Sequence, residues 1–310
     1  MNCVDPHNLT SMEIRITQTN DGGIFSGPHC NDFEYTYAGT TYRVRIDQEI
    51  KRYIRIGTNQ IVDISKLLEM ENFIEQFIYL FDGRFYPIEH MEIIDSKEDP
   101  TIYKKHVDNY LNRRLSIYNS IDLTRYSFMK LINFEDINFE EILLKWCSVD
   151  HELDIAYPMF LYCLSDIPMP IDCKIASIIE IAKPLSEIVE TNNSSFSLER
   201  NKKGQIELKS ALKTIIDYYG APIFKKEMSN DYDTFLQKLV NTRNKISHVR
   251  SFRNKQCLDG VECAFYLAKL SIMYREIIYS VLGIDKNLYM NAIIDAISHW
   301  DNWYYNNPTS

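Results

Sequence analysis

The spacing of apolar residues changes along this chain, and the change restricts the folds that it can adopt. In the part before Asp95, three stretches alternate apolar and polar side chains, as half-buried β-strands do: residues 12–17, 41–46 and 51–56. After Phe139 this alternation is replaced by apolar residues at helical spacing. The sequence therefore predicts an α+β fold in which a β-rich part is followed by an all-helical part.

The first part also has the pattern of a hairpin and of one long helix. Residues 34–37 and 41–46 alternate on either side of Gly39, as two antiparallel strands joined by a tight turn do. Residues 64–80 change to helical spacing and predict a helix with one apolar face. Residues 85–94 return to the pattern of a strand.

The second part is predicted to be a helical bundle. A long helical stretch covers residues 172–190, and Pro184 is expected to kink it or to divide it into two shorter helices. Further helices are expected at residues 140–147, 206–219, 231–249, 261–282 and 287–300. We place the domain boundary between residues 95 and 138. The chain is accordingly divided into an N-terminal β-rich sensing or regulatory domain, residues 1–130, and a helical bundle, residues 131–310.

Composition argues against several classes of protein. The net charge of -9 disfavours a long surface that coats nucleic acid. The seven cysteines form no Cys-x-x-Cys pair and none has a histidine at zinc-finger spacing, so we expect a reduced, cytoplasmic protein with no metal site and no cofactor. Residues 1–11 lack the features of a signal peptide. No apolar run approaches the ~18 residues of a membrane span, and no membrane partner is expected.

One region of this acidic chain is strongly basic. From Thr234 to Leu258 there is no Asp or Glu, and the formal charge is +6. Either this region meets a polyanionic partner, or carboxylates elsewhere in the fold neutralise it. The cations of this basic island are Lys238, Arg243, Lys245, Arg250, Arg253 and Lys255.

The basic island contains three side chains suited to phosphate chemistry. Arg243 is followed by Asn244, and His248 lies five residues after the arginine. On a helix Asn244 and His248 share a face, whereas Arg243 and His248 point about 140° apart. The two side chains can converge only at an irregular helix end, or across a two-fold axis from a second copy of the helix. The alternative is that His248 lies on the helix surface and caps a neighbouring carbonyl.

The segment Arg243-Asn244-Lys245-Ile246-Ser247-His248 resembles the Arg-x4-6-His motif of HEPN ribonucleases, including the polar residue that commonly follows the arginine. Together with Asn241 and Thr242 it looks most like the ApeA-like HEPN branch, in which a non-helical N-terminal domain precedes the HEPN domain. The resemblance covers roughly residues 140–300. HEPN proteins paired with nucleotidyltransferase antitoxins often carry His-x-Tyr. Here Arg250 stands two residues after His248, which argues against that class.

The resemblance implies a metal-independent endoribonuclease that cuts RNA (tRNA or mRNA) at a homodimer cleft, in bacterial defence against phage by abortive infection. Arg243 would stabilise the phosphate, His248 would move protons, and Asn244 would position them. The N-terminal domain would bind a phage-derived trigger. Two rival functions are a non-catalytic HEPN-fold protein that binds RNA or nucleotide or acts as a scaffold, and a regulatory subunit of a larger complex. Further RNA contacts are expected from Lys245, Arg250, Arg253 and Lys255, although charges near a helix end are often only solvated.

Overall fold

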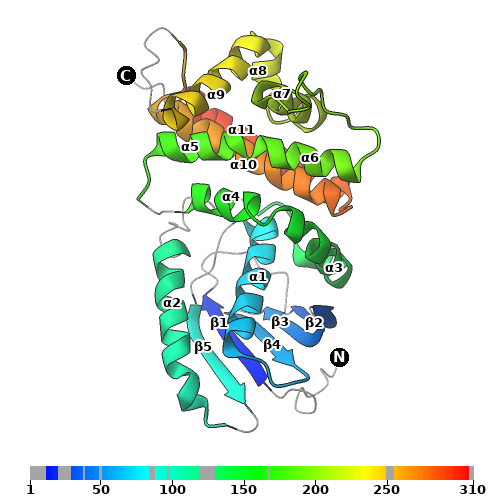
Figure 1. Ribbon diagram of the computed structural model, residues 1–310, viewed down its shortest axis with the longest axis vertical. Coiled ribbons are helices and arrows are strands. Elements are labelled where there is room, and N and C mark those ends of the chain that lie inside the picture. Colours follow the sequence, from blue (N-terminus) through cyan, green and yellow to red (C-terminus); the bar gives the residue numbers. More distant parts are fainter. Residues whose placement is uncertain are drawn as a thin grey trace. The chain divides into compact units, whose positions relative to one another are not determined.

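The computed structural model describes residues 12–19, 29–37, 39–48, 51–83, 88–95, 98–118, 130–165, 168–248 and 255–306. The chain forms two compact units, Met1–Leu144 and Lys145–Ser310, and we describe each by itself (Figure 1). The described strands all lie in the first unit, and the described part of the second is helical apart from one isolated bridge. The predicted α+β fold is therefore confirmed. Our division of the chain after residue 130 stays a prediction.

A five-stranded antiparallel sheet forms the centre of the first unit, in the order β2-β3-β4-β1-β5. Its strands are β1 Met12–Thr19, β2 His29–Tyr37, β3 Thr40–Gln48, β4 Lys51–Thr58 and β5 Ile88–Asp95. The predicted hairpin is confirmed as the β2–β3 pair, with Gly39 at a φ of 78°, which glycine adopts without steric strain. Val44, Ile54 and Ile56 are fully buried, as their alternation with polar residues requires.

Two helices pack against this sheet. Helix α1, Ile64–Asp82, contacts β1 and β4, and α2, Lys104–Tyr118, contacts β5. Helix α1 begins after Asp63, whose carboxylate accepts the N–H of Ser65 at 2.8 Å, and it ends at Gly83, where φ is 66°. The helix predicted at residues 64–80 is therefore confirmed.

The second unit is built around α10, Gly260–Val281, which is buried on almost every side. This helix packs against α5, α6, α7 and α11. The other helices, of which α3 spans the boundary between the units, are α3 Phe139–Val149, α4 Ala156–Leu164, α5 Ile171–Glu180, α6 Ala182–Asn192, α7 Leu208–Tyr219, α8 Lys225–Ser229, α9 Tyr232–Ser247 and α11 Met290–Asn306. Short 3-10 helices lie at Pro100–Tyr103, Phe134–Asp136, Asp150–Glu152 and Lys286–Leu288.

Pro184 divides the long helix predicted at residues 172–190. Helix α5 ends at Glu180, α6 begins at Ala182, and Ile181 lies in the break. Proline has no N–H, and its ring crowds the carbonyl four residues earlier, which here belongs to Glu180. The break therefore lies where the proline requires it. None of the described helices is long and apolar enough to cross a membrane.

Candidate functional site

The motif lies in the last turn of α9, and local interactions set both ends of this helix. At the start, the Asp231 carboxylate accepts the N–H of Thr234 at 3.2 Å and its hydroxyl at 2.6 Å. At the end, His248 follows the helix with φ -105° and ψ 0°, and its N–H bonds the Asn244 carbonyl at 3.1 Å. The predicted helix is thus confirmed to within two residues at each end.

Two buried polar side chains of α9 hold the chain that returns toward α10. The Asn241 amide donates to the carbonyl of Gln256 at 3.0 Å. The Thr242 hydroxyl accepts the N–H of Leu258 at 2.7 Å. Sequence reasoning gave neither residue a role beyond the family resemblance. Their bonds attach the segment from Gln256 to Leu258 to the turn that carries the motif.

Arg243 is held by two partners. Its Nε donates to Oε2 of Glu180 at 2.5 Å, and its Nη1 donates to Oδ1 of Asn244 at 3.0 Å. The arginine side chain is 23% exposed, so the group is partly accessible to solvent. A guanidinium has five N–H donors, so further donors remain for an anion.

Glu180 is a residue of this site that the sequence did not indicate. It lies at the end of α5, 63 residues before Arg243, and α5 packs against α9. Its other oxygen lies 3.5 Å from the ammonium group of Lys183 on α6. The only signal in the sequence was Pro184, which predicted a helix break in this region but not what the break would place there.

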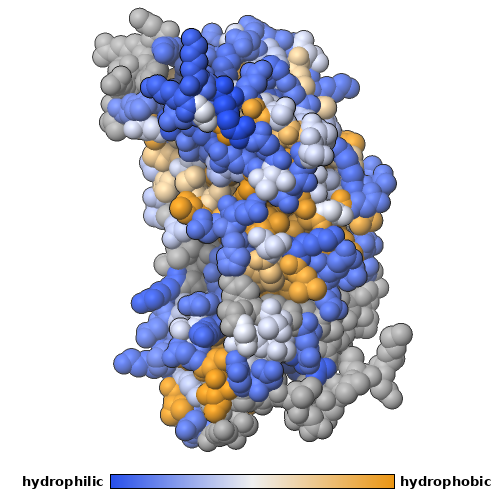
Figure 2. Space-filling view, turned by 45° about the vertical axis from the view of Figure 1, so that its right-hand side comes forward, coloured by the Kyte–Doolittle hydropathy of each residue, from blue (hydrophilic) through white to orange (hydrophobic). Residues whose placement is uncertain are grey.

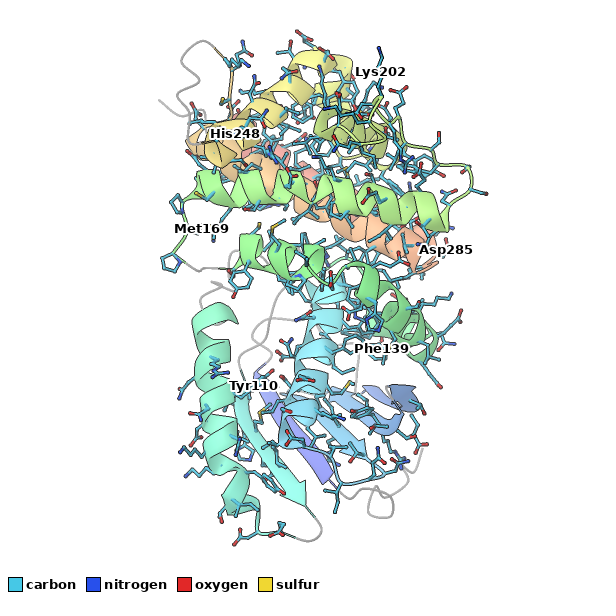
Figure 3. All side chains as sticks on the ribbon, viewed as in Figure 1. Tyr110, Phe139, Met169, Lys202, His248 and Asp285 are labelled. Atoms are coloured by element: carbon cyan, nitrogen blue, oxygen red, sulfur yellow. The ribbon has the colours of Figure 1, made fainter. Side chains whose placement is uncertain are left out.

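His248 is exposed and directly follows the last residue of α9 (Figure 3). The N–H of His248 still makes the helical bond to the carbonyl four residues earlier, so the start of this residue follows the path of α9. Among the described residues, no hydrogen bond or ion pair joins Arg243 to His248, and their convergence within one chain stays a prediction. The backbone N–H of His248 caps a carbonyl, which is a different contact from the ring cap considered as the alternative.

Carboxylates from other helices partly neutralise the basic island. The Lys238 ammonium lies 2.6 Å from Glu262 on α10, and the Lys245 ammonium lies 3.8 Å from Asp172 on α5. Lys255 is exposed. The predicted RNA contacts Arg250 and Arg253 lie outside the described residues. The +6 counted along the sequence therefore overstates the local charge in the fold, although hydrophilic residues do predominate near α7, α8 and α9 on the face seen in Figure 2.

The cysteines near the motif are unsuited to act as nucleophiles. Burial raises the pKa of the Cys257 thiol. Burial, with the nearby Asp172 carboxylate, raises the pKa of Cys263 to about 12. Both thiols are therefore protonated at neutral pH, and the thiolate is the reactive form. The described part of the chain contains no group of three or more His, Cys, Asp or Glu side chains arranged to hold a metal ion.

Comparison with known families places part of the second unit in a described family. Residues 172–288 match the family model described as Apea-like HEPN. The matched range contains α5 from its second residue on, together with α9 and α10, and hence Glu180, Arg243, Asn244 and His248. No curated protein and no solved structure matches the chain.

Proposed function

Because residues 172–288 match the family model described as Apea-like HEPN, we propose that this protein is an endoribonuclease that cleaves RNA without a metal ion. The match supports a nuclease-like function of the HEPN type. One observation carries the finer proposal: Arg243 is held in place by Glu180 and Asn244 at the end of α9, where His248 is exposed. This arrangement places a fixed cation and an exposed imidazole at the same end of one helix.

The proposed reaction uses the nucleophile that RNA itself carries. The ribose 2'-oxygen forms a bond to phosphorus, the bond from phosphorus to the 5'-oxygen breaks, and the products are a 2',3'-cyclic phosphate and a 5'-hydroxyl. One His248 takes the proton of the 2'-hydroxyl, and a second one, from another copy of the chain, gives a proton to the 5'-oxygen. The cleft of a homodimer would supply both histidines.

Arg243 would stabilise the negative charge that develops on the phosphorane. Glu180 and Asn244 occupy its Nε and Nη1 donors, which leaves other N–H groups for phosphate oxygens. A preorganised donor of this kind typically contributes ~10²–10³-fold in rate. In this proposal Asn244 and Glu180 position the arginine. Lys245, Arg250, Arg253 and Lys255 would bind the RNA on either side of the cleaved bond.

The charge pairing also favours one rival function. Arg243, Lys238 and Lys245 each face a carboxylate, so the site attracts a phosphate less strongly than its sequence implies. This feature suits a HEPN-fold protein that binds RNA or nucleotide, or serves as a scaffold or regulatory subunit, without cutting.

For the nuclease, we extend the proposal to a role in defence against phage, with the N-terminal domain as the sensor of a phage-derived trigger.

The deciding experiment incubates purified full-length protein with total RNA and with tRNA in excess EDTA. We expect wild type to leave cyclic phosphate ends, and His248→Ala and Arg243→Ala to be at least ~10²-fold slower. His151→Ala and Arg200→Ala are the matched controls, since both residues are exposed in the same unit, and they should cleave at the wild-type rate.

Three outcomes separate the functions. Cleavage by His248→Ala at the wild-type rate would remove the histidine from the mechanism. Loss of cleavage on chelation alone would contradict the metal-independent reaction. RNA binding by wild type with no cleavage, measured also after addition of lysate from phage-infected cells, would favour the binding function.

A further inference from the structure

The break between α5 and α6 lies beside the residue that holds Arg243. Helix α5 ends at Glu180, and the regular helix resumes with the N–H of Leu185 bonded to the carbonyl of Ile181 at 3.2 Å. Pro184 is four residues after Glu180 and cannot donate to its carbonyl. The direction in which the Glu180 carboxylate leaves the helix is therefore coupled to the proline.

A buried tyrosine from α10 supports the same break. Tyr274 is fully buried, and its hydroxyl donates to the carbonyl of Ile178 at 2.9 Å. Ile178 lies two residues before Glu180, in the last turn of α5. This bond fixes the backbone of that turn to the central helix of the unit.

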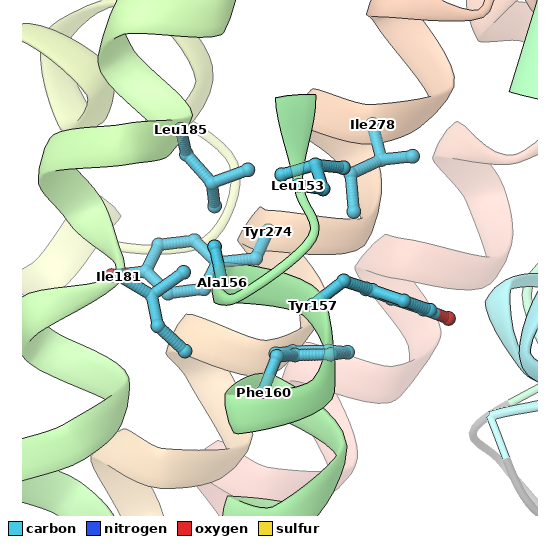
Figure 4. A pocket seen from close by; sticks show the side chains of 8 residues that line it. All are labelled: Leu153, Ala156, Tyr157, Phe160, Ile181, Leu185, Tyr274 and Ile278. Carbon is cyan, nitrogen blue, oxygen red and sulfur yellow. The ribbon is translucent and has the colours of Figure 1, made fainter. Parts of the chain in front are cut away.

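Apolar side chains surround the break. A very small apolar pocket of about 10 Å³ lies there, formed by α4, α10 and the α5–α6 junction (Figure 4). Ile181, which directly follows Glu180, lines the pocket together with Leu185 and the ring of Tyr274. A space of this size has room for about one water molecule at most, so the junction is nearly as closely packed as other protein interiors. Within this packing, Pro184 and the Tyr274 hydroxyl are the groups that act on the backbone of the break.

We propose that Pro184 and Tyr274 are positioning residues for RNA cleavage, which act by placing Glu180 against Arg243. The inference rests on the proposed function. A straight helix through residues 171–192 would turn the Glu180 carboxylate away from its present position, and Arg243 would lose its Nε partner. A misplacement of about 1 Å at a reacting group is worth up to ~10²-fold in rate, so the break needs to move Glu180 only slightly to matter.

The test uses two substitutions in the full-length protein. Pro184→Ala restores an N–H that can bond the Glu180 carbonyl and favours a continuous helix. Tyr274→Phe keeps the ring and removes only the hydroxyl that anchors Ile178. For both we expect kcat for RNA cleavage to fall by roughly tenfold to 10²-fold while KM stays within about twofold.

Matched controls separate this role from a loss of folding. Pro222→Ala alters a proline of the same unit away from the break, and Tyr219→Phe removes a buried hydroxyl that faces Ser280 at 3.4 Å. Both should keep the wild-type kcat. Pro184→Ala should be at least as resistant to denaturant as wild type, because alanine favours a helix, so a lower kcat in this variant would not result from unfolding.

Two further measurements make the outcome decisive. In a Glu180→Ala background, Pro184→Ala should cause no additional loss of kcat, because both act through the same carboxylate. The ¹H–¹⁵N signal of the Arg243 Nε–H group should shift in Glu180→Gln and in Pro184→Ala alike. Wild-type kcat and an unshifted signal in Pro184→Ala would overturn the inference. Shifted signals in a wild-type protein that cuts no RNA would instead refute the proposed function and leave the role of the break in placing Glu180 intact.

Discussion

Lys269 places a charged group in the interior of the helical unit. Its side chain is 1% exposed, and its ammonium group lies 2.7 Å from Glu227 on α8 and 3.5 Å from Asp301 on α11. The ammonium group also lies over the rings of Phe224 and Phe265, 5.2 and 4.9 Å from their centroids. This ammonium group therefore links α8, α10 and α11 in a medium where a charge without a partner is costly.

Replacing Lys269 by Met keeps much of the apolar stem and removes the charge. The Glu227 carboxylate, in a side chain only 5% exposed, is then left without its cation. Breaking a buried ion pair from one side costs about 3–5 kcal/mol. Asp301 is affected less, because it is 17% exposed and keeps Lys226 at 3.1 Å. We expect a loss of ~3 kcal/mol in the free energy of unfolding, equivalent to a Tm lower by roughly 6–12 °C for a unit of this size.

Tryptophan fluorescence during urea unfolding measures this loss in the helical unit that contains Lys269. The three tryptophans, Trp146, Trp300 and Trp303, all lie in Lys145–Ser310. The signal therefore follows the helical unit alone, and the midpoint with its slope gives the free energy of unfolding.

A compensated variant and an exposed control test the physical reason. Lys269→Met combined with Glu227→Leu leaves no unpaired charge on this pair and should recover most of the lost stability. Lys213→Met removes the cation of a pair with Asp217 in which Lys213 is 57% exposed, and should change the stability by less than ~0.5 kcal/mol. If Lys269→Met unfolds within ~0.5 kcal/mol of wild type, or the double variant is no more stable than the single one, the argument from an orphaned charge is wrong.

Three smaller predictions concern pH and helix capping. Hydrogen bonds from Arg200 and from the N–H of Leu198 lower the pKa of Glu190. The stability that this carboxylate contributes is therefore present above the pKa of glutamate in the unfolded chain, and it is lost as pH falls through the lower pKa of the folded state. Glu190→Gln should flatten the acid side of the curve of urea midpoint against pH. Burial raises the pKa of Glu276 above its ordinary 4.5, so its effect on stability has the opposite sign. The free energy of unfolding declines as pH rises from 4.5 through the higher pKa of the folded state, and Glu276→Gln should not show this decline. Asp231→Ala should lower the urea midpoint through the lost cap of α9, whereas Asp231→Asn should retain most of the stability.

Much of the secondary structure was predictable, because it depends on residues close together in the chain. The spacing of apolar residues and the positions of glycine and proline predict three features that the structure has. These are the hairpin about Gly39, helix α1 and the division of the long helix at Pro184. Helix α8 was missed. It has five residues, which is too short for a helical period to be recognised.

The candidate site was predictable only in part. The pattern of Arg243, Asn244 and His248 identified a segment that lies within the matched HEPN range. Glu180 could not be found in the same way, because a carboxylate on one amphipathic helix looks like any other until the packing partner is known. The charge of the basic island was overstated for the same reason, since Glu262 and Asp172 come from helices remote in sequence.

The sequence by itself determined the β2–β3 hairpin, helix α1, the place where α5 breaks and the segment that carries the Arg-x4-His motif. These properties arise from backbone restrictions and from the periodic spacing of apolar side chains, which act over a few residues. Only the tertiary structure decided that Glu180 meets Arg243 across 63 residues of chain. It also decided that His248 lies exposed at the end of α9. Such contacts depend on how the helices pack against one another, and no local pattern encodes that arrangement.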